Sequence, residues 1–277
     1  MSSELIGLAL RIGYSGDMPD SRSRVLIITS SMGIGAATAR LASAAGTCLL
    51  LATGDQQSGW ELAAETRADC WVGDLTRPSA ADSVVAQCVS RFGRVDALFN
   101  AAGLSGRRFG DGPTDECTDE GWDVTLAHNL KMTFLMCRAV IRRMMQQPVA
   151  ENGLRGAILN MGSVLDTSPE PRHFATHAYA AAKGGVVALS RSMAAYYAPH
   201  KIRVNVIAPG LTRTPASEKS VADPELIQFL KKKQPLTDGM LDAEDVARAA
   251  LFLLGEEAQA ITGQVVRVDA GWSITGA

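Results

Sequence analysis

The sequence has few cysteines and no long apolar run. Its five cysteines, at positions 48, 70, 88, 117 and 137, are odd in number and include no Cys-x-x-Cys pair. This pattern argues against a disulfide framework and against a structural zinc site. No run of 18 apolar residues occurs, so we expect neither a signal peptide nor a membrane-spanning helix. Together these absences favour a protein of the reducing cytoplasm.

The sequence also lacks a surplus of charge of one sign. Its 27 Lys and Arg nearly balance 29 Asp and Glu, which gives a formal net charge of −2. Such a balance provides no basic field suited to nucleic acid, so we expect no nucleic-acid partner. We interpret the run Lys231-Lys232-Lys233 as a solvated helix face.

The 277 residues, of which 47% are hydrophobic, fit one globular domain over 24–277. Residues 1–23 are expected to form an extension outside the core. Within the domain, short β-rich apolar runs alternate with longer helical patterns. This alternation predicts right-handed βαβ crossovers and a doubly wound α/β fold, in which about seven parallel strands carry helices on both faces. The expected strands are 25–29, 48–53, 70–72, 97–100, 157–161, 203–208 and 265–269, and the expected helices lie near 34–45, 59–67, 79–92, 119–147, 178–198 and 242–254.

The first expected strand runs through a turn of small residues into a helix. The turn contains Gly33 and Gly35, which would let backbone amides and the helix start approach a dinucleotide pyrophosphate. A plain tight turn is the alternative interpretation of a Gly-x-Gly pair. The alternating strands and helices around the turn favour the phosphate site.

Tyr179 and Lys183 stand four residues apart in an Ala-rich helical stretch. On a helix they share a face. A nearby ammonium favours the phenolate, so we expect the pKa of Tyr179 to be lowered toward neutrality. Such a phenol can serve as the acid/base of a carbonyl–alcohol oxidoreductase.

From about Arg24 to Gly271 the sequence resembles the short-chain dehydrogenase/reductase family, whose fold is Rossmann-like. Several motifs match in order: the glycine turn at 29–35, Asn100-Ala101-Ala102-Gly103, Tyr179 with Lys183, and Asp269-Ala270-Gly271 at the closing strand. The glycine turn is one residue shorter than the family's Thr-Gly-x-x-x-Gly-x-Gly, and Thr29 or Ser30 stands where its first glycine would be.

The resemblance implies a catalytic set of four residues. Ser163 would hydrogen-bond the substrate oxygen and Tyr179 would exchange its proton. Lys183 would support the phenolate and bind the nicotinamide ribose, and Asn129 would hold a water that links Lys183 to solvent. The cofactor-binding residues implied are Thr29, Ser31, Gly33, Ile34, Gly35, Asp55, Asp74, Leu75, Asn100, Ala101, Gly103, Tyr179, Lys183, Pro209, Gly210 and Thr214.

The sequence only partly indicates whether the cofactor is NAD or NADP. In this fold an acidic residue at the end of the second strand binds the ribose 2′-hydroxyl. Thr53 occupies that position and Asp55 follows two residues later, while neither Met32 nor Gly54 is basic. Asp55 would repel a 2′-phosphate, so we favour NAD and leave NADP open.

We therefore expect an NAD(P)-dependent oxidoreductase that acts on a secondary alcohol or its ketone. The alternative is a non-catalytic dinucleotide-binding regulatory or scaffold protein, which the shortened turn would favour. No metal is expected, because His173 and His177 lack a His-Glu-x-x-His context; we expect them to shape the substrate cleft. Arg107 and Arg108 are interpreted as solvated loop charges, with contacts to an anionic substrate as the alternative.

The expected assembly is a homodimer or homotetramer. The stretches 122–147 and 178–198 carry apolar residues on more than one face, so part of their surface must be buried by a second copy. The residues concerned are Leu126, Leu130, Phe134, Met136, Met144, Met193, Tyr196 and Tyr197. The closing strand and Trp272 are expected to form a second contact that makes a tetramer.

Overall fold

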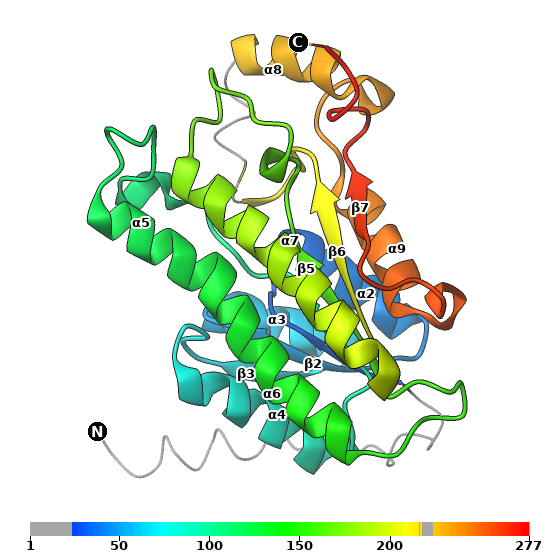
Figure 1. The fold of residues 1–277 in the computed structure, drawn as a ribbon. Helices are drawn as coiled ribbons and strands as arrows, with labels where there is room; N and C mark the ends of the chain where they lie inside the picture. The colour runs from blue at the N-terminus through cyan, green and yellow to red at the C-terminus, as the bar shows by residue number, and fades with distance from the viewer. Residues whose placement is uncertain (1–23, 216, 218–223, 277) are drawn as a thin grey trace.

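The computed structural model describes residues 24–215, 217 and 224–276. The predicted extension 1–23 lies outside the described residues. Among the described residues, parallel strands form one sheet in the order β3-β2-β1-β4-β5-β6-β7 (Figure 1). The predicted doubly wound α/β fold is therefore confirmed. The strands are β1 (Val25–Ile28), β2 (Cys48–Thr53), β3 (Asp69–Val72), β4 (Ala97–Asn100), β5 (Gly156–Met161), β6 (Ile202–Pro209) and β7 (Val265–Val268).

The centre of the sheet fixes where a ligand can bind. Ile27 of β1 pairs with Leu50 of β2 on one side and with Leu98 of β4 on the other. The chain thus builds outward to β3 first and then returns to add β4 through β7 beyond β1. In open α/β sheets the crevice at such a reversal, outside the carboxyl ends of the strands, is where ligands bind.

Helices cover both faces of the sheet because successive strand residues point to opposite sides. Val25 and Ile27 pack with α4, α6 and α7, whereas Leu26 and Ile28 pack with α2, α3 and α9. The helices are α2 (Gly33–Ala44), α3 (Gln56–Thr66), α4 (Pro78–Phe92), α5 (Asp119–Leu126), α6 (Met132–Gln146), α7 (His177–Tyr197), α8 (Pro224–Lys233) and α9 (Ala243–Leu254).

Two helices differ from the sequence-based expectation. The predicted helix 119–147 is interrupted by a π-helical turn (Ala127–Lys131) that separates α5 from α6. The helix expected from residue 59 begins at Gln56, because the side chain of Asp55 accepts a hydrogen bond from the backbone N–H of Ser58 at 2.7 Å and caps it. α8 contains the run Lys231-Lys232-Lys233, which the sequence assigned to a helix face without giving the helix bounds.

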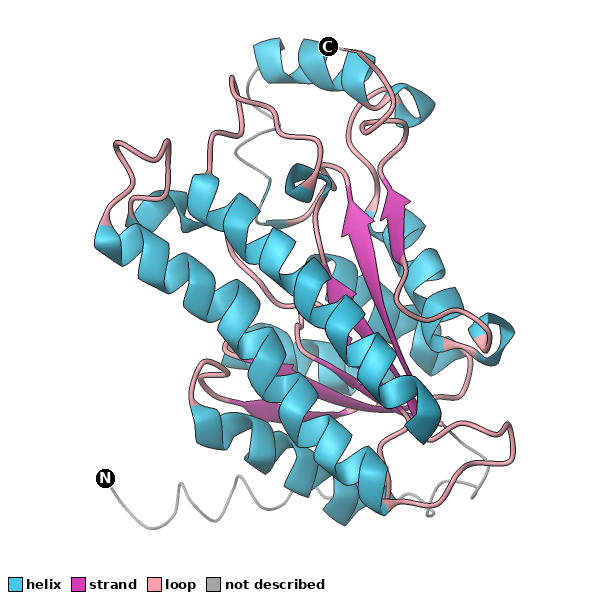
Figure 2. Ribbon diagram, in the orientation of Figure 1, coloured by secondary structure: helices cyan, strands magenta, loops and turns pink. Residues whose placement is uncertain are grey.

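α8 and the C-terminal residues form a small apolar cluster beyond the carboxyl end of the sheet. The arrowheads of β6 and β7 point toward it (Figure 2). Trp272 is 1% exposed, and the rings of Phe174 and Phe229 each lie 5.7 Å from it. The predicted subunit contact through Trp272 is therefore wrong, because this side chain is enclosed within its own chain.

One lysine of the predicted solvated run is also buried. Lys233 is 9% exposed, whereas Lys231 and Lys232 are exposed as expected. Its Nζ donates a hydrogen bond to the carbonyl of Thr275 at 2.7 Å and lies 6.0 Å from the centre of the Trp272 ring. Lys233 thus ties α8 to the C-terminal segment.

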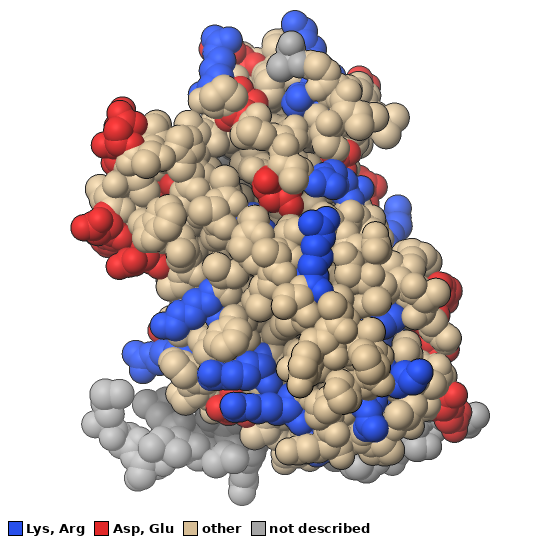
Figure 3. Space-filling model, in the orientation of Figure 1, with Lys and Arg blue, Asp and Glu red and all other residues tan. Residues whose placement is uncertain are grey.

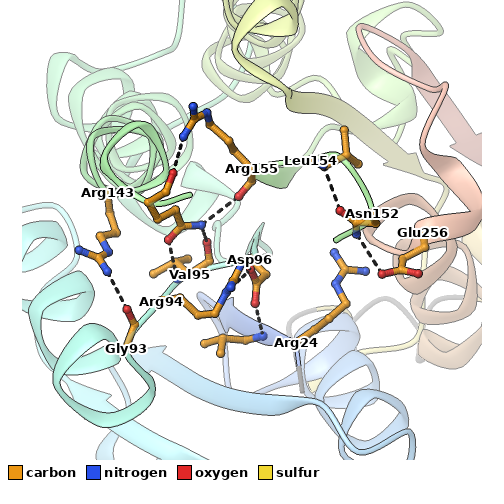
Figure 4. A network of polar contacts seen from close by, with 12 residues as sticks. Arg24, Gly93, Arg94, Val95, Asp96, Arg143, Asn152, Leu154, Arg155 and Glu256 are labelled. Atoms are coloured by element: carbon orange, nitrogen blue, oxygen red, sulfur yellow. Dashed lines mark hydrogen bonds and ion pairs between the residues drawn. The ribbon is translucent and has the colours of Figure 1, made fainter. Parts of the chain in front are cut away.

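The amino end of the sheet is closed by a polar network (Figure 4). Arg94 Nε donates to Asp96 Oδ1 at 2.7 Å. Gln147, which ends α6, is 3% exposed. Its Nε2 donates to the carbonyls of Val95 and Arg155 at 2.7 and 2.9 Å, while its Oε1 accepts from the N–H of Val95 at 3.2 Å. The carboxamide thereby holds α6 against the strands β4 and β5.

Charged side chains of both signs are distributed over the face that carries α6 and α7 (Figure 3). None of the described helices combines the length and the apolar character needed to cross a membrane.

Candidate active site

Tyr179 and Lys183 share one face in the first turns of α7. The Lys183 ammonium lies 5.4 Å from the centre of the Tyr179 ring, and Lys183 is 2% exposed. Its Nζ donates a hydrogen bond to the carbonyl of Met161 at 2.9 Å. The ammonium therefore joins the start of α7 to the end of β5.

Ser163 follows β5 and brings a second hydroxyl to this point. Its side chain is 7% exposed and is a hydrogen-bond partner of the Tyr179 phenol. Its Oγ also accepts from the backbone N–H of Leu165 at 3.2 Å, which fixes its direction. Two hydroxyls at one point can hydrogen-bond a single substrate oxygen.

Burial dominates the electrostatics of the pair. It raises the pKa of Tyr179 to about 12, and the hydrogen bond with Ser163 opposes this rise only in part. It also lowers the pKa of Lys183 to about 8. The predicted lowering of the Tyr179 pKa is therefore wrong, because loss of hydration penalises the phenolate more than the hydrogen bond with Ser163 favours it. At neutral pH the phenol keeps its proton, and most Lys183 side chains are charged.

Asn129 lies beside Lys183, inside the π-helical turn. It is fully buried, and its Nδ2 donates to the carbonyls of Leu104 and Thr125 at 2.9 and 2.8 Å. Its Oδ1 has no hydrogen-bond partner among the described residues. A Cβ at Gly103 would lie 2.6 Å from this Oδ1 and 3.3 Å from Lys183 Nζ. The acceptor is thus free to bind a hydroxyl or a water next to the ammonium.

The glycine turn fits an approaching phosphate. Met32, the N-cap of α2, makes no side-chain hydrogen bond to the helix start, so no cap side chain competes for the amides there. Gly33 has a φ of +53°, and a Cβ on it would lie 2.8 Å from Thr214 Cγ2. A Cβ on Gly35 would lie 2.6 Å from the Cβ of Ser30. The turn therefore requires both glycines, and it brings Thr214 to the start of α2.

Hydroxyl groups join the turn to the ends of β2 and β4. Ser31 Oγ hydrogen-bonds Thr53 Oγ1 at 2.9 Å and Ser58 Oγ at 2.7 Å. Thr29 Oγ1 accepts from the N–H of Ala102 at 3.3 Å. Hydrogen bonds with Ser58 hold the pKa of the exposed Asp55 carboxyl below its ordinary value. Asp55 is therefore a negative charge at the end of β2.

Two further predicted cofactor residues follow β3. Asp74 accepts hydrogen bonds from the Oγ1 and the N–H of Thr76 at 2.6 and 2.9 Å, and these hold the pKa of its carboxyl low. Leu75 is 5% exposed and packs in the core beside α4. Only the backbone of Leu75 is thus placed to contact a ligand.

The buried network behind the site was not predicted. Asn100 Nδ2 donates to Asn160 Oδ1 at 2.8 Å, and Asn160 Nδ2 donates to Ser190 Oγ at 2.9 Å. These bonds connect β4, β5 and α7. The sequence signal is Asn160 itself, a polar residue inside an apolar strand, because a buried amide needs partners.

The remaining predicted positions lie in three places. Ala101 and Gly103 follow β4, while Pro209 ends β6 and the N–H of Gly210 donates to Val268 O at 3.0 Å. Ile34 lies partly buried at the start of α2.

The loop histidines have separate partners. His177 Nδ1 lies 2.8 Å from Thr114 Oγ1, whereas the ring of His173 packs 5.1 Å from that of Phe229. Arg107, expected to be solvated, donates to the carbonyl of His173 and lies 5.8 Å from the centre of the Phe174 ring. No group of three potential metal ligands occurs among residues 24–215, 217 and 224–276.

Comparison with known proteins agrees with this architecture. A family model described as enoyl-(acyl carrier protein) reductase matches residues 28–273. The chain belongs to the short-chain dehydrogenase/reductase family. It is 34% identical over 257 residues to D-threitol dehydrogenase of Mycolicibacterium smegmatis, covering 90% of this chain and 92% of that protein.

Two other relatives of this short-chain dehydrogenase/reductase bear on its activity. The "inactive 2-(S)-hydroxypropyl-CoM dehydrogenase 2" of Xanthobacter autotrophicus is 38% identical over 240 residues, covering 84% of this chain and 98% of that protein. A 3-ketoacyl-(acyl-carrier-protein) reductase from Brucella melitensis, solved with NADH, superimposes with a TM-score of 0.81 at 28% identity, covering 91% and 98% of the two chains. The predicted class, an NAD(P)-dependent oxidoreductase acting on alcohol or ketone substrates, is confirmed by the family.

Proposed function

We propose that Tyr179 is the acid/base of a hydride transfer between a nicotinamide dinucleotide and a secondary alcohol or its ketone. The observation that carries this proposal is the convergence of Tyr179, Ser163 and Lys183 at the end of β5. When bound, the dinucleotide supplies the hydride donor or acceptor.

In the direction of ketone reduction, the protein supplies a hydrogen bond and a proton. The Ser163 hydroxyl donates to the carbonyl oxygen, and the Tyr179 phenol transfers its proton to that oxygen as negative charge develops. The charged Lys183 stabilises the phenolate that remains. Its neighbour Asn129 would hold a water through Oδ1, and this water would return a proton from solvent. In alcohol oxidation the same residues act in reverse.

The glycine turn and the carboxylate of Asp74 support binding of the dinucleotide. The pyrophosphate would lie against the amides at the start of α2, near Gly33 and Gly35. Asp74 would contact the adenine end of the dinucleotide, and Lys183 would bind the nicotinamide ribose. The cradle formed by these glycines and Thr214 fits a group that must approach the backbone closely.

Asp55 supports a preference for NAD over NADP. Its carboxylate is exposed at the end of β2, and its hydrogen bonds with Ser58 favour the charged form. A negative charge near the adenosine ribose repels a 2′-phosphate, and neither Met32 nor Gly54 offers a compensating cation.

We infer that the outer faces of α6 and α7 form the contact of a homodimer; a homotetramer requires a second contact through another surface. Trp122 of α5, Phe134 of α6 and Tyr196 of α7 are 44%, 42% and 69% exposed. Of the apolar residues named for these two stretches, Met136, Met144 and Met193 are buried inside the chain and belong to the faces that cover the sheet. Light scattering tests the assembly, and a monomer of 29.3 kDa at micromolar concentration contradicts it. Cytoplasmic location stays a prediction from the cysteine pattern.

A non-catalytic dinucleotide-binding protein is the second candidate. The shortened glycine turn favours it, and one relative is named as inactive. The test is to measure the thermal stabilisation of the protein by NAD and NADP, and then the absorbance of the reduced nicotinamide with a panel of alcohols and ketones. Binding with turnover supports the enzyme, whereas binding without turnover on the whole panel supports the second candidate.

A further inference from the structure

The loop between β4 and α5 reaches the start of α7 through a buried carboxylate that the proposed mechanism does not use. Asp111 is 6% exposed. Its Oδ1 accepts a hydrogen bond from the backbone N–H of Ala178, and its Oδ2 accepts one from the N–H of Tyr179, each at 3.0 Å. Both oxygens are therefore engaged by the first turn of the helix that carries the proposed acid/base.

This contact replaces a cap that the local sequence does not provide. The first N–H groups of an α-helix have no partner within the helix. Thr176, the N-cap of α7, makes no side-chain hydrogen bond to them. The carbonyl of Gly112 accepts from the N–H of His177 at 3.1 Å. The two residues Asp111 and Gly112 thus satisfy the first three amides of α7.

The loop that carries Asp111 is itself held firmly against α5. The N–H of Asp111 donates to the carbonyl of Gly106 at 3.1 Å. A Cβ on Gly106 would overlap the side chain of Thr125 and lie 2.8 Å from the Cβ of Asp111, and one on Gly121 would overlap the backbone of Gly110. Because of these close contacts, the carboxylate of Asp111 has little freedom to move, and so it can hold the first turn of α7 in one position.

We propose that Asp111 is a positioning residue for catalysis, which fixes the backbone at Tyr179 and so directs the phenol toward Ser163. The inference rests on the proposed acid/base role of Tyr179. A carboxylate suits the task, because it accepts from two N–H groups at once through charge-assisted bonds and is stabilised at a helix N-terminus. An Asn amide would turn its NH₂ group toward one of these donors.

The test compares Asp111→Asn with a control in the same loop. Thr118 caps α5 by accepting from the N–H of Gly121 at 3.0 Å and donates to the carbonyl of Phe109 at 3.0 Å, and its side chain makes no hydrogen bond to the described residues of α7. We expect Asp111→Asn to lower kcat about 10- to 100-fold, the scale of a misplaced reacting group. The dissociation constant of NAD and the KM for the alcohol should change by less than about twofold, since uniform binding is untouched. Thr118→Ala should leave kcat within about twofold.

A fall in kcat at an unchanged KM indicates that Tyr179 is misplaced. A general loosening of the site would also weaken ligand binding and raise KM. An unchanged kcat in Asp111→Asn overturns the inference, as does an equal loss of kcat in Thr118→Ala. If Asp111→Asn fails to fold, Asp111→Ser takes its place with the same expectations.

Hydrogen exchange distinguishes failure of this inference from failure of the proposed function. If the wild-type chain turns over no alcohol or ketone on the panel, the proposed function is wrong. The positional claim is then judged by the amides of Ala178 and Tyr179, which should exchange at least about tenfold faster in Asp111→Asn and not in Thr118→Ala. Unchanged exchange overturns it.

Discussion

Lys183 Nζ donates to the carbonyl of Met161 at 2.9 Å, so the ammonium at the start of α7 is anchored to the end of β5. The anchor keeps a cation within 5.4 Å of the Tyr179 ring. Because burial raises the pKa of this phenol to about 12, Tyr179 keeps its proton at neutral pH, as the proposed role of proton donor in ketone reduction requires.

The first prediction concerns Tyr179→Phe. The substitution removes the hydroxyl and keeps the ring, so the fold should persist while kcat falls at least about 100-fold, the scale of a lost acid/base. Steady-state kinetics with the best alcohol of the panel provides the measurement. Tyr196→Phe is the control, since this residue is 69% exposed, and it should leave kcat unchanged. Retained activity in Tyr179→Phe would refute the proposed role.

The second prediction concerns Lys183 and stability. Burial lowers the pKa of Lys183 from 10.5 to about 8, so the unfolded chain binds more protons between these values. Stability from this residue must therefore rise with pH between about 8 and 10.5. Lys183→Met should unfold at a higher temperature than the wild type at pH 7, by an amount equivalent to at most about 3 kcal/mol.

The pH dependence of that difference is the decisive measurement. Unfolding followed by circular dichroism should show the advantage of Lys183→Met shrinking as pH rises from about 8 to 10.5. An advantage that does not change with pH would show that the buried charge is not its cause. The same variant should lose activity if Lys183 supports the phenolate as proposed.

The third prediction concerns Asp55 and the dinucleotide. Asp55→Asn removes the negative charge and keeps a side chain that can cap α3. The KM for NADP should fall about tenfold while that for NAD changes little, because only the 2′-phosphate meets the charge. Asp69→Asn, at the start of β3, is the matched control. If the NADP to NAD ratio stays constant in Asp55→Asn, the carboxylate does not select the cofactor.

The fourth prediction concerns Gln147 at the amino end of the sheet. Gln147→Ala leaves the N–H and the carbonyl of Val95 and the carbonyl of Arg155 without this partner. We expect a loss of about 3 kcal/mol in the free energy of unfolding, since each unsatisfied buried group costs roughly 1–3 kcal/mol. Urea titration measures it, with the exposed neighbour Gln146→Ala changing stability by less than about 0.5 kcal/mol. Equal effects would contradict the assigned role.

The sheet could be predicted because its central strands are buried on both faces and form continuous apolar runs, as in Val25–Ile28. The shared face of Tyr179 and Lys183 could likewise be predicted, because helix geometry places residues four apart on one face. Both features are local in the sequence.

Features that depend on distant segments could not be predicted. The pKa of Tyr179 depends on burial that no local pattern records. The cap of α7 comes from Asp111, 67 residues before Ala178. Lys233 and Trp272 are buried only because α8 and the C-terminal segment pack on one another. In each case the burial or the hydrogen bonding of a residue depends on segments that lie far from it in the sequence.

The enclosure of Trp272 has an optical consequence. Trp60 and Trp122 are 57% and 44% exposed, whereas Trp272 is 1% exposed and makes edge-to-face contacts with Phe174 and Phe229. Acrylamide should therefore quench the first two indoles readily and leave the emission of Trp272. In a Trp71→Phe variant, which removes the partly buried indole of β3, that residual fluorescence comes from the junction of α8, the loop after β5 and the C-terminal segment. It gives an intrinsic reporter of any movement there when dinucleotide or substrate binds.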